Sequence, residues 1–186
     1  MIAIKINDRQ ITQAVKRLSK AGGNLKPAME DIGEYLTRAT KKRFGKSEGR
    51  APDGTSWKAN TDATIAEFVR RKKGGTVKRP GEKIKSGIAA GKKPLIGESK
   101  RLGTEIHYEA DANSVAVGSS EEQAAVMQFG AKKGEFGRTK RGAPIPWGDI
   151  PARPYLGLSE EDKIQTLEIL NEHLAAAGSS PRVWGT

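Results

Sequence analysis

The two histidines, His107 and His173, have the side chains best suited to proton transfer or metal binding near neutral pH. His107 lies in a strand-like pattern, and His173 lies near the end of a predicted helix, where a cation is favoured. The chain has no cysteine. A zinc site would therefore need carboxylates around these histidines, and no metal-ligand spacing links the two. We expect structural or solvent-exposed roles for both histidines, and neither a metal nor a cofactor.

Motifs for phosphate binding or nucleophilic catalysis are also missing from the sequence. The stretch from Gly87 to Lys93 resembles a phosphate-binding loop only distantly, because its glycine spacing is one residue short and Lys93 replaces the Ser or Thr. Neither a nucleophile elbow nor a metalloprotease motif occurs. Asp53 and Asp111 lie in predicted turns, which explains them without catalysis. The sequence predicts a protein that is not an enzyme, although carboxylates paired only by the fold stay open as an alternative.

One arginine, Arg153, is held between Pro151 and Pro154 in the segment 150–159. Each proline fixes its own φ and keeps the preceding residue out of the helical region, so this backbone is stiff and extended. Such a strand suits a surface that binds a neighbour better than an active site that must close. We therefore expect Arg153, with Pro151, Pro154 and Tyr155 beside it, to lie on a subunit or partner interface. An internal pair between Arg153 and a carboxylate is the alternative.

The elements that must position these residues follow from the spacing of apolar residues, which predicts an α+β fold. We expect a short antiparallel sheet packed with two N-terminal helices and a C-terminal helix, and long basic mobile loops. The predicted elements are a strand at 2–6, helices at about 8–20 and 27–44, a hairpin of 104–109 with 115–118, a helix at 120–129 and a helix from 159. We expect a single domain over 1–177 and a flexible tail over 178–186.

Three other side chains are candidates for either the core or an interface. Trp57 follows the turn Pro52-Asp53-Gly54, and we expect it to cap the core, with an interface anchor as the alternative. Gln128 and Phe129 end a predicted helix before Gly130, and we expect them to pack into the core rather than to form a contact site. Because an interface role is the alternative for each, Trp57, Gln128 and Phe129 are also candidate interface residues.

The last predicted helix has two contrasting faces. Its inner stripe is expected to contain Ile164, Leu167, Leu170 and Leu174. Its outer face carries Glu160, Glu161, Glu168 and Glu172, so it is a candidate acidic surface for binding a neighbour. The acidic start of the helix predicted at 120–129 is the alternative.

The net charge of +11 in 186 residues indicates an anionic partner, either nucleic acid or an acidic protein surface. Residues 70–93 contain ten basic residues, one acid and five glycines, which predicts a mobile basic insertion. A second basic loop spans 132–141. No aromatic residue lies among the basic residues of 70–93, so a stacking platform for single strands is not expected there, and any DNA contact is expected to involve phosphates without base readout. The candidate residues for DNA or an acidic partner are Arg70, Arg71, Lys72, Lys73, Lys78, Arg79, Lys132, Lys133, Arg138, Lys140 and Arg141.

The N-terminal residues are too few and too polar for a signal peptide, and no apolar run approaches the roughly 20 residues that span a bilayer. We therefore expect a soluble protein made in the cytoplasm, without contact to a membrane.

Several patches, in order, resemble the phage virion morphogenesis family, which includes tail-completion proteins of contractile-tailed and Mu-like phages. They lie between about Asp8 and Leu174, and the most specific are Gln128-Phe129-Gly130 and the Pro-Ala-Arg-Pro run in 150–159. Two positions depart from the family pattern: an expected tyrosine reads Ala124 or Ala125, and a frequent histidine reads Met127. The other matching patches are 51–57 and 94–97.

The resemblance implies an assembly protein that acts at the head–tail junction and completes the tail so that it can join a DNA-filled head. It also implies other phage tail or neck proteins as partners, and a homo-oligomeric ring, often sixfold in relatives. The protein would then be found in the host cytoplasm during assembly and in the virion. The net charge alone favours a different class, a basic accessory protein that binds nucleic acid non-specifically.

Overall fold

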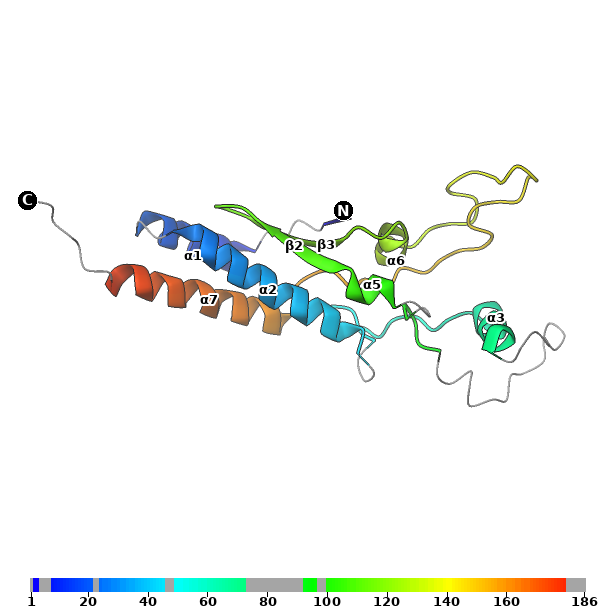
Figure 1. Cartoon of the computed structure of the whole chain (residues 1–186), viewed down its shortest axis with the longest axis horizontal. Helices are drawn as coiled ribbons and strands as arrows, with labels where there is room; N and C mark the ends of the chain where they lie inside the picture. Colours follow the sequence, from blue (N-terminus) through cyan, green and yellow to red (C-terminus); the bar gives the residue numbers. More distant parts are fainter. Residues whose placement is uncertain are drawn as a thin grey trace, which may run out of the picture.

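The computed structural model describes residues 2–3, 8–21, 24–45, 49–72, 92–96 and 100–179. Helices lie beside a small antiparallel sheet in an elongated molecule (Figure 1), which confirms the predicted α+β class. Three long helices and the sheet occupy one end of the long axis. Shorter helices and an extended loop occupy the other end.

The helices that follow Asp8 and Ser159 begin at the caps that the sequence predicts, and Pro27 lies in the first turn of the second helix, as expected. The Asp8 carboxylate accepts hydrogen bonds from the backbone N–H groups of Gln10 and Ile11, at 2.9 and 3.1 Å. Ser159 and Asp162 form a reciprocal capping box, in which each side chain accepts from the backbone N–H of the other, at 2.8 and 3.1 Å. These contacts satisfy N–H groups that a helix start leaves unpaired. The helices are α1 (Arg9–Lys20), α2 (Leu25–Arg43) and α7 (Glu160–Ser179).

The sheet has the order β1-β3-β2, and both pairings are antiparallel. Its strands are β1 (Ile2–Ala3), β2 (Ile106–Ala110) and β3 (Val115–Ser119). The sheet approaches α2 so closely that a Cβ built on Gly33 would lie 2.3 Å from the ring atom Cδ2 of Tyr108. Only glycine at position 33 allows this helix to lie against the hairpin.

Two apolar clusters stabilise the two halves of the molecule. The first joins α1, α2 and α7 through the buried residues Ala14, Leu18, Leu25, Ala28, Met29, Ile32 and Leu170. The second lies where the chain crosses toward the other end, and it consists of Ala51, Trp57, Leu102, Ile106, Ala124, Tyr155 and Leu156. Burial of such side chains is the main favourable contribution to folding.

The shorter helices are where the structure departs most from the sequence prediction. The helix α6 spans Ala124–Phe129, so the expected start at Ser120 is wrong. Here Ser119, and not Ser120, accepts from the N–H of Glu121 at 3.2 Å. The sequence analysis did not predict α3 (Asp62–Lys72) or the single turn α5 (Arg101–Thr104).

The predicted limits of the basic insertion and of the tail change accordingly. Residues 70–72 are helical and belong to α3, so the insertion does not begin at residue 70. The α7 helix continues through Ser179, so the tail does not begin at residue 178. The rest of the predicted strand, 4–6, most of the insertion, 73–91, and residues 180–186 lie outside the described residues.

The inner stripe of α7 also differs from the prediction. Ile164 is 56 % exposed, whereas Asp162, Thr166 and Leu170 are buried. Polar Asp162 occupies the inner face because Arg43 of α2 binds it there. The expectation that Ile164 packs inside is therefore wrong.

Candidate assembly interfaces

Within the segment 150–159 that the sequence singles out, residues 153–157 join the two halves of the molecule. Arg153, Tyr155 and Leu156 are all buried. The segment lies between the 131–150 loop and α7 and contacts residues of α2, of α6 and of the stretch 57–59. The Arg153 N–H donates to the carbonyl of Met127 at 2.8 Å, and the other bonded backbone groups of the segment are held by side chains.

Arg153 is 6 % exposed and donates hydrogen bonds to two backbone carbonyls. Its Nε lies 2.8 Å from the oxygen of Lys58, and an Nη lies 3.0 Å from the oxygen of Ala59. Burial lowers the pKa of this guanidinium from its ordinary value, although an arginine stays charged at neutral pH. The prediction that Arg153 is presented on a surface is wrong. Its acceptors are carbonyls, so the alternative of an internal carboxylate partner is wrong as well.

Gln128 binds the same segment from the other side. Its Oε1 accepts from the N–H groups of Tyr155 and Leu156, at 2.9 and 3.0 Å, and its Nε2 donates to the carbonyl of Leu156 at 3.2 Å. The Tyr155 ring is fully buried, and burial raises the pKa of its hydroxyl to about 12. Gln128 therefore has the structural role that we expected over a contact role. Phe129, expected beside it in the core, is instead 64 % exposed.

Trp57 is a core residue, as the sequence predicts. Its Nε1 donates to the carbonyl of Pro154 at 2.6 Å, and its ring lies 5.4 Å from that of Phe44. Phe44 also makes an edge contact with Tyr155, again at 5.4 Å between ring centroids. Pro154 is exposed and Pro151 is half-buried. An interface role for these two prolines stays a prediction.

A buried ion pair, which the sequence analysis did not identify, attaches α7 to α2. Arg43 binds the carboxylate of Asp162 and also donates to the carbonyls of Tyr155 and Gly157, at 2.8 and 3.1 Å. The Tyr35 hydroxyl donates to the same carboxylate at 3.2 Å, and burial, followed by the charge of Asp162, raises its pKa to about 12. The sequence contained one signal that Arg43 lies on the inner face of α2. Ile32, Leu36, Thr40 and Arg43 follow one another at spacings of four, four and three, so they share one face of the helix.

The loop after α6 forms a projecting arm, which we define as residues 131–150 (Figure 1). Ala131 and Ile150 close its base by exchanging backbone hydrogen bonds of 2.9 and 2.7 Å. Further out, Phe136 donates to Ile145 at 2.8 Å, and Thr139 donates to Ala143 at 2.8 Å. Gly130, directly before the arm, has a φ of +79°, and a Cβ on this residue would lie 2.7 Å from the oxygen of Ile150. Backbone hydrogen bonds between its two sides thus hold the arm together.

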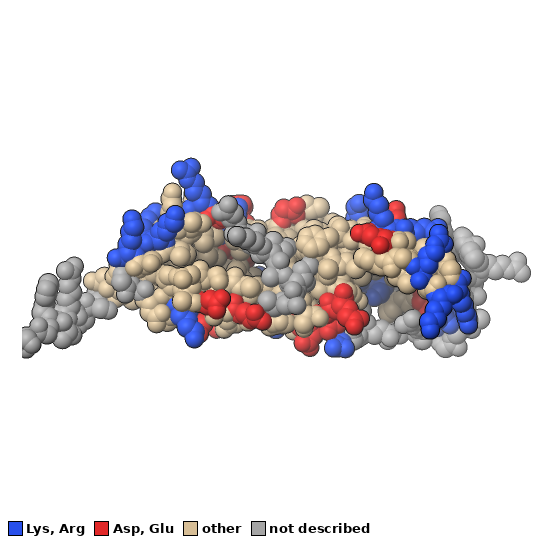
Figure 2. All heavy atoms as spheres, turned by 90° about the horizontal axis from the view of Figure 1, so that it is seen from above, with Lys and Arg blue, Asp and Glu red and all other residues tan. Residues whose placement is uncertain are grey.

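The arm presents aromatic and basic side chains together. Trp147 is 77 % exposed, and Phe136 and Ile145 are also exposed. All five predicted basic residues of this loop, Lys132, Lys133, Arg138, Lys140 and Arg141, are exposed. In Figure 2, basic side chains gather toward the ends of the molecule, including the end that carries the arm, and acidic ones lie mostly between them.

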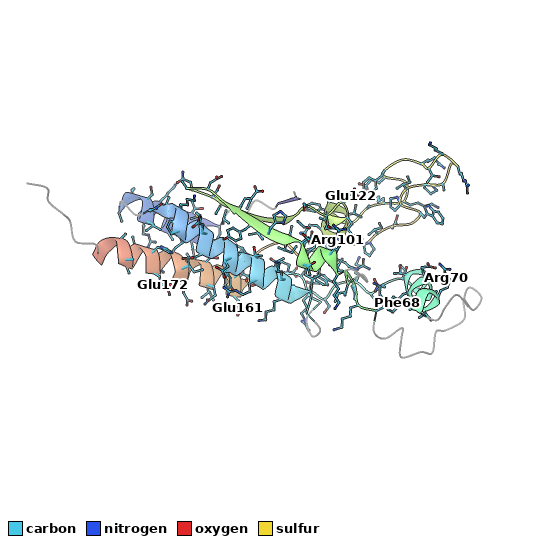
Figure 3. All side chains as sticks on the ribbon, in the orientation of Figure 1. Phe68, Arg70, Arg101, Glu122, Glu161 and Glu172 are labelled. Carbon is cyan, nitrogen blue, oxygen red and sulfur yellow. The ribbon has the colours of Figure 1, made fainter. Side chains whose placement is uncertain are left out.

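The other predicted basic residues lie on or beyond α3. Arg70 is exposed on α3 (Figure 3). It binds Glu67 within the same helix, so its charge is partly balanced. Arg71 and Lys72 are the last residues of α3. Lys73, Lys78 and Arg79 lie outside the described residues.

The two histidines lie on different elements. His107 lies in β2, and His173 of α7 binds Asp31 of α2 at 2.7 Å. Within the part of the chain that the structure describes, no three His, Cys, Asp or Glu side chains cluster as metal ligands. No helix in the described ranges is long and apolar enough to cross a membrane.

Comparison with known proteins gives two findings that agree with each other. A sequence profile of the phage virion morphogenesis family matches residues 6–175. The protein named Mu-like prophage FluMu G protein 2, from Haemophilus influenzae, is 30 % identical over 174 residues, which is 93 % of this chain and 96 % of that protein. No solved structure matches significantly. On this evidence the chain belongs to the phage virion morphogenesis family.

Proposed function

We propose that this protein acts at the head–tail junction of a phage or prophage and completes the tail so that it can join a DNA-filled head. The observation that carries the proposal is the family match, which extends over residues 6–175. A Mu-like prophage relative of nearly the same length supports it. In this proposal the protein is structural, its partners are tail or neck proteins, and it has no catalytic step.

The shape of the chain supports assembly into a ring. The arm of residues 131–150 projects at one end of the long axis, and the helices α1, α2 and α7 lie at the other (Figure 1). Two different surfaces far apart on one subunit suit a heterologous contact, in which each copy binds the next head to tail. A ring around the tail axis results if the rotation closes.

Electron microscopy of lysate from the parent phage, with this gene inactivated, tests the proposal. We expect full heads that are separate from tails, and tails that are unjoined or of abnormal length. A plasmid copy of the gene should restore joined particles, which controls for effects on neighbouring genes. Intact, infectious particles in the absence of the gene would exclude a head–tail role.

A second candidate function, non-specific nucleic-acid binding, is supported by the arm alone. The arm has five exposed basic residues and only two acids, Glu135 and Asp149, within residues 131–150, so its net charge is positive. Binding through phosphates should weaken steeply with salt. If this candidate holds, replacing Lys132, Lys133, Lys140 and Arg141 by Gln should reduce both DNA affinity and the salt slope, whereas unchanged binding would contradict it.

A further inference from the structure

The exposed large apolar side chains of the described residues occur in only two places. Four of them, Phe129, Phe136, Ile145 and Trp147, lie on or at the base of the arm. The fifth is Ile164, on the outer face of α7. Apolar side chains gathered on a projecting arm, as these four are, mark a binding surface more often than single exposed residues do.

The arm is built to bind without first folding. Its backbone pairs with itself from Ala131–Ile150 at the base to Thr139–Ala143 near the tip, and Lys133 donates its N–H to the Asp149 carboxylate at 2.8 Å. An ordered arm loses little conformational entropy on association, which favours affinity. Arg138 contributes to this order by donating to the carbonyl of Gly142 at 2.9 Å.

The outer face of α7 is complementary to the arm in charge. Glu161, Ile164 and Glu168 follow one another at spacings of three and four, so they lie on one face of the helix, and all three are exposed. The full helix has five acidic residues and one lysine. Figure 3 shows Glu161 and Glu172 on the side of α7 that faces away from the sheet. One apolar side chain surrounded by carboxylates is thus available to an aromatic, basic partner.

We infer that the arm of one copy docks on the outer face of α7 in a second copy. Trp147 and Phe136 would cover Ile164, while Lys140 and Arg141 approach Glu161 and Glu168. An apolar centre with a polar rim is the usual composition of a protein interface. Because the arm projects away from α7 of its own chain (Figure 1), the contact joins different copies and is heterologous. The inference deepens the proposed function and rests on it for the ring that the contact would close.

Disulfide trapping tests this contact, because the chain contains no cysteine of its own. Gly148→Cys places a thiol beside Trp147, where a Cβ meets no other atom within 4 Å. Asn171→Cys places a thiol on the outer face of α7, two turns beyond Ile164. The two variants carry different tags and are produced together in cells that assemble the gene-inactivated phage, and the lysate is treated with copper phenanthroline as the oxidant, because the cytosol keeps thiols reduced. The matched control pairs Gly148→Cys with Ala125→Cys, an exposed position on α6.

We expect a mixed disulfide between the arm variant and the α7 variant, several-fold more abundant than in the control pair. Reversal of the arm charges by Lys140→Glu and Arg141→Glu should abolish it, and Glu161→Lys with Glu168→Lys in the partner should restore it. No mixed disulfide from variants that restore infectious particles would overturn the contact while the proposed function stands. A disulfide from the arm to another phage protein only, or loss of DNA binding as the sole effect of reversal, would also overturn it.

Discussion

At the scale of single residues, the hydrogen bonds of a few buried side chains hold the 153–157 segment in place. Gln128 is the clearest case, because it satisfies the backbone N–H groups of both Tyr155 and Leu156. We expect Gln128→Leu to leave these two donors unpaired and to lower the free energy of unfolding by about 2–4 kcal/mol. Urea denaturation measures the loss, and Gln123→Ala, at an exposed position next to α6, should change it by less than about 0.5 kcal/mol. Equal stability of both variants would contradict the assigned role.

Tyr155 predicts how stability depends on alkaline pH. Burial raises the pKa of its hydroxyl from 10.0 to about 12 in the folded protein, so the unfolded chain ionises first. The contribution to stability is therefore complete below about pH 10 and is lost as the pH rises toward 12. We expect the free energy of unfolding to fall less steeply over this range in Tyr155→Phe than in the wild type. Urea titrations at pH 9, 10 and 11 measure this free energy. If it falls with pH equally steeply in Tyr155→Phe and in the wild type, the hydroxyl is not buried and protonated.

The sequence predicted some of these residue roles and not others. Trp57 was predicted correctly, because a turn followed by a tryptophan next to apolar patches indicates a core residue. Arg153 was misassigned, because its acceptors are the backbone carbonyls of Lys58 and Ala59, and carbonyls leave no mark in a sequence. Phe129 was misassigned because a short helix of six residues does not fix which side of its last turn is buried.

At the scale of elements, the contact between α2 and the hairpin depends on one glycine. Gly33→Ala would place a Cβ 2.3 Å from the Tyr108 ring, so we expect the free energy of unfolding to fall by about 1–3 kcal/mol. The matched control is Gly178→Ala in α7, where a Cβ meets nothing within 4 Å. That change should be neutral or stabilise by up to about 1 kcal/mol, because alanine is the better helix former. The midpoint of thermal unfolding should therefore fall in Gly33→Ala and stay the same or rise in Gly178→Ala.

The attachment of α7 to α2 depends on Arg43. Replacing it by Met leaves the buried carboxylate of Asp162 without its cation, so we expect a loss of about 3–5 kcal/mol. Lys42→Met, at the exposed neighbouring position, controls for removing a charge from the same turn. If both variants unfold at the same urea concentration, the pair does not hold the helices together.

Elements with local signals were predictable, and elements fixed by distant contacts were not. The caps at Asp8 and Ser159 involve neighbours within three residues, so the starts of α1 and α7 followed from the sequence. The inner face of α7 did not, because Asp162 is buried by a partner more than a hundred residues away. A rule that places apolar residues inside selects Ile164 instead. No element was predicted for residues 62–69, and only residues 70–72 of α3 fall within the predicted basic insertion.

At the scale of the whole molecule, the α+β class and the order of the patches were predictable, and the arrangement of surfaces was not. The sequence marked 132–141 as a basic loop. It did not indicate that Phe136 and Trp147 would be exposed on the same arm, because their exposure depends on backbone pairing across residues 131–150. The surface that we propose for assembly therefore lies on this arm and not at Arg153.

The central claim, completion of tails before they join heads, is tested most directly by order of addition. Heads and tails are purified separately from lysate of the gene-inactivated parent phage. Either the heads or the tails are incubated with the purified protein, and unbound protein is then removed. The treated component is mixed with the other component, which has not met the protein. Infectious particles are then counted. We predict that treated tails join untreated heads and that treated heads yield far fewer particles. Particle yields that stay at background in both orders, from components that join in wild-type extract, would contradict the claim.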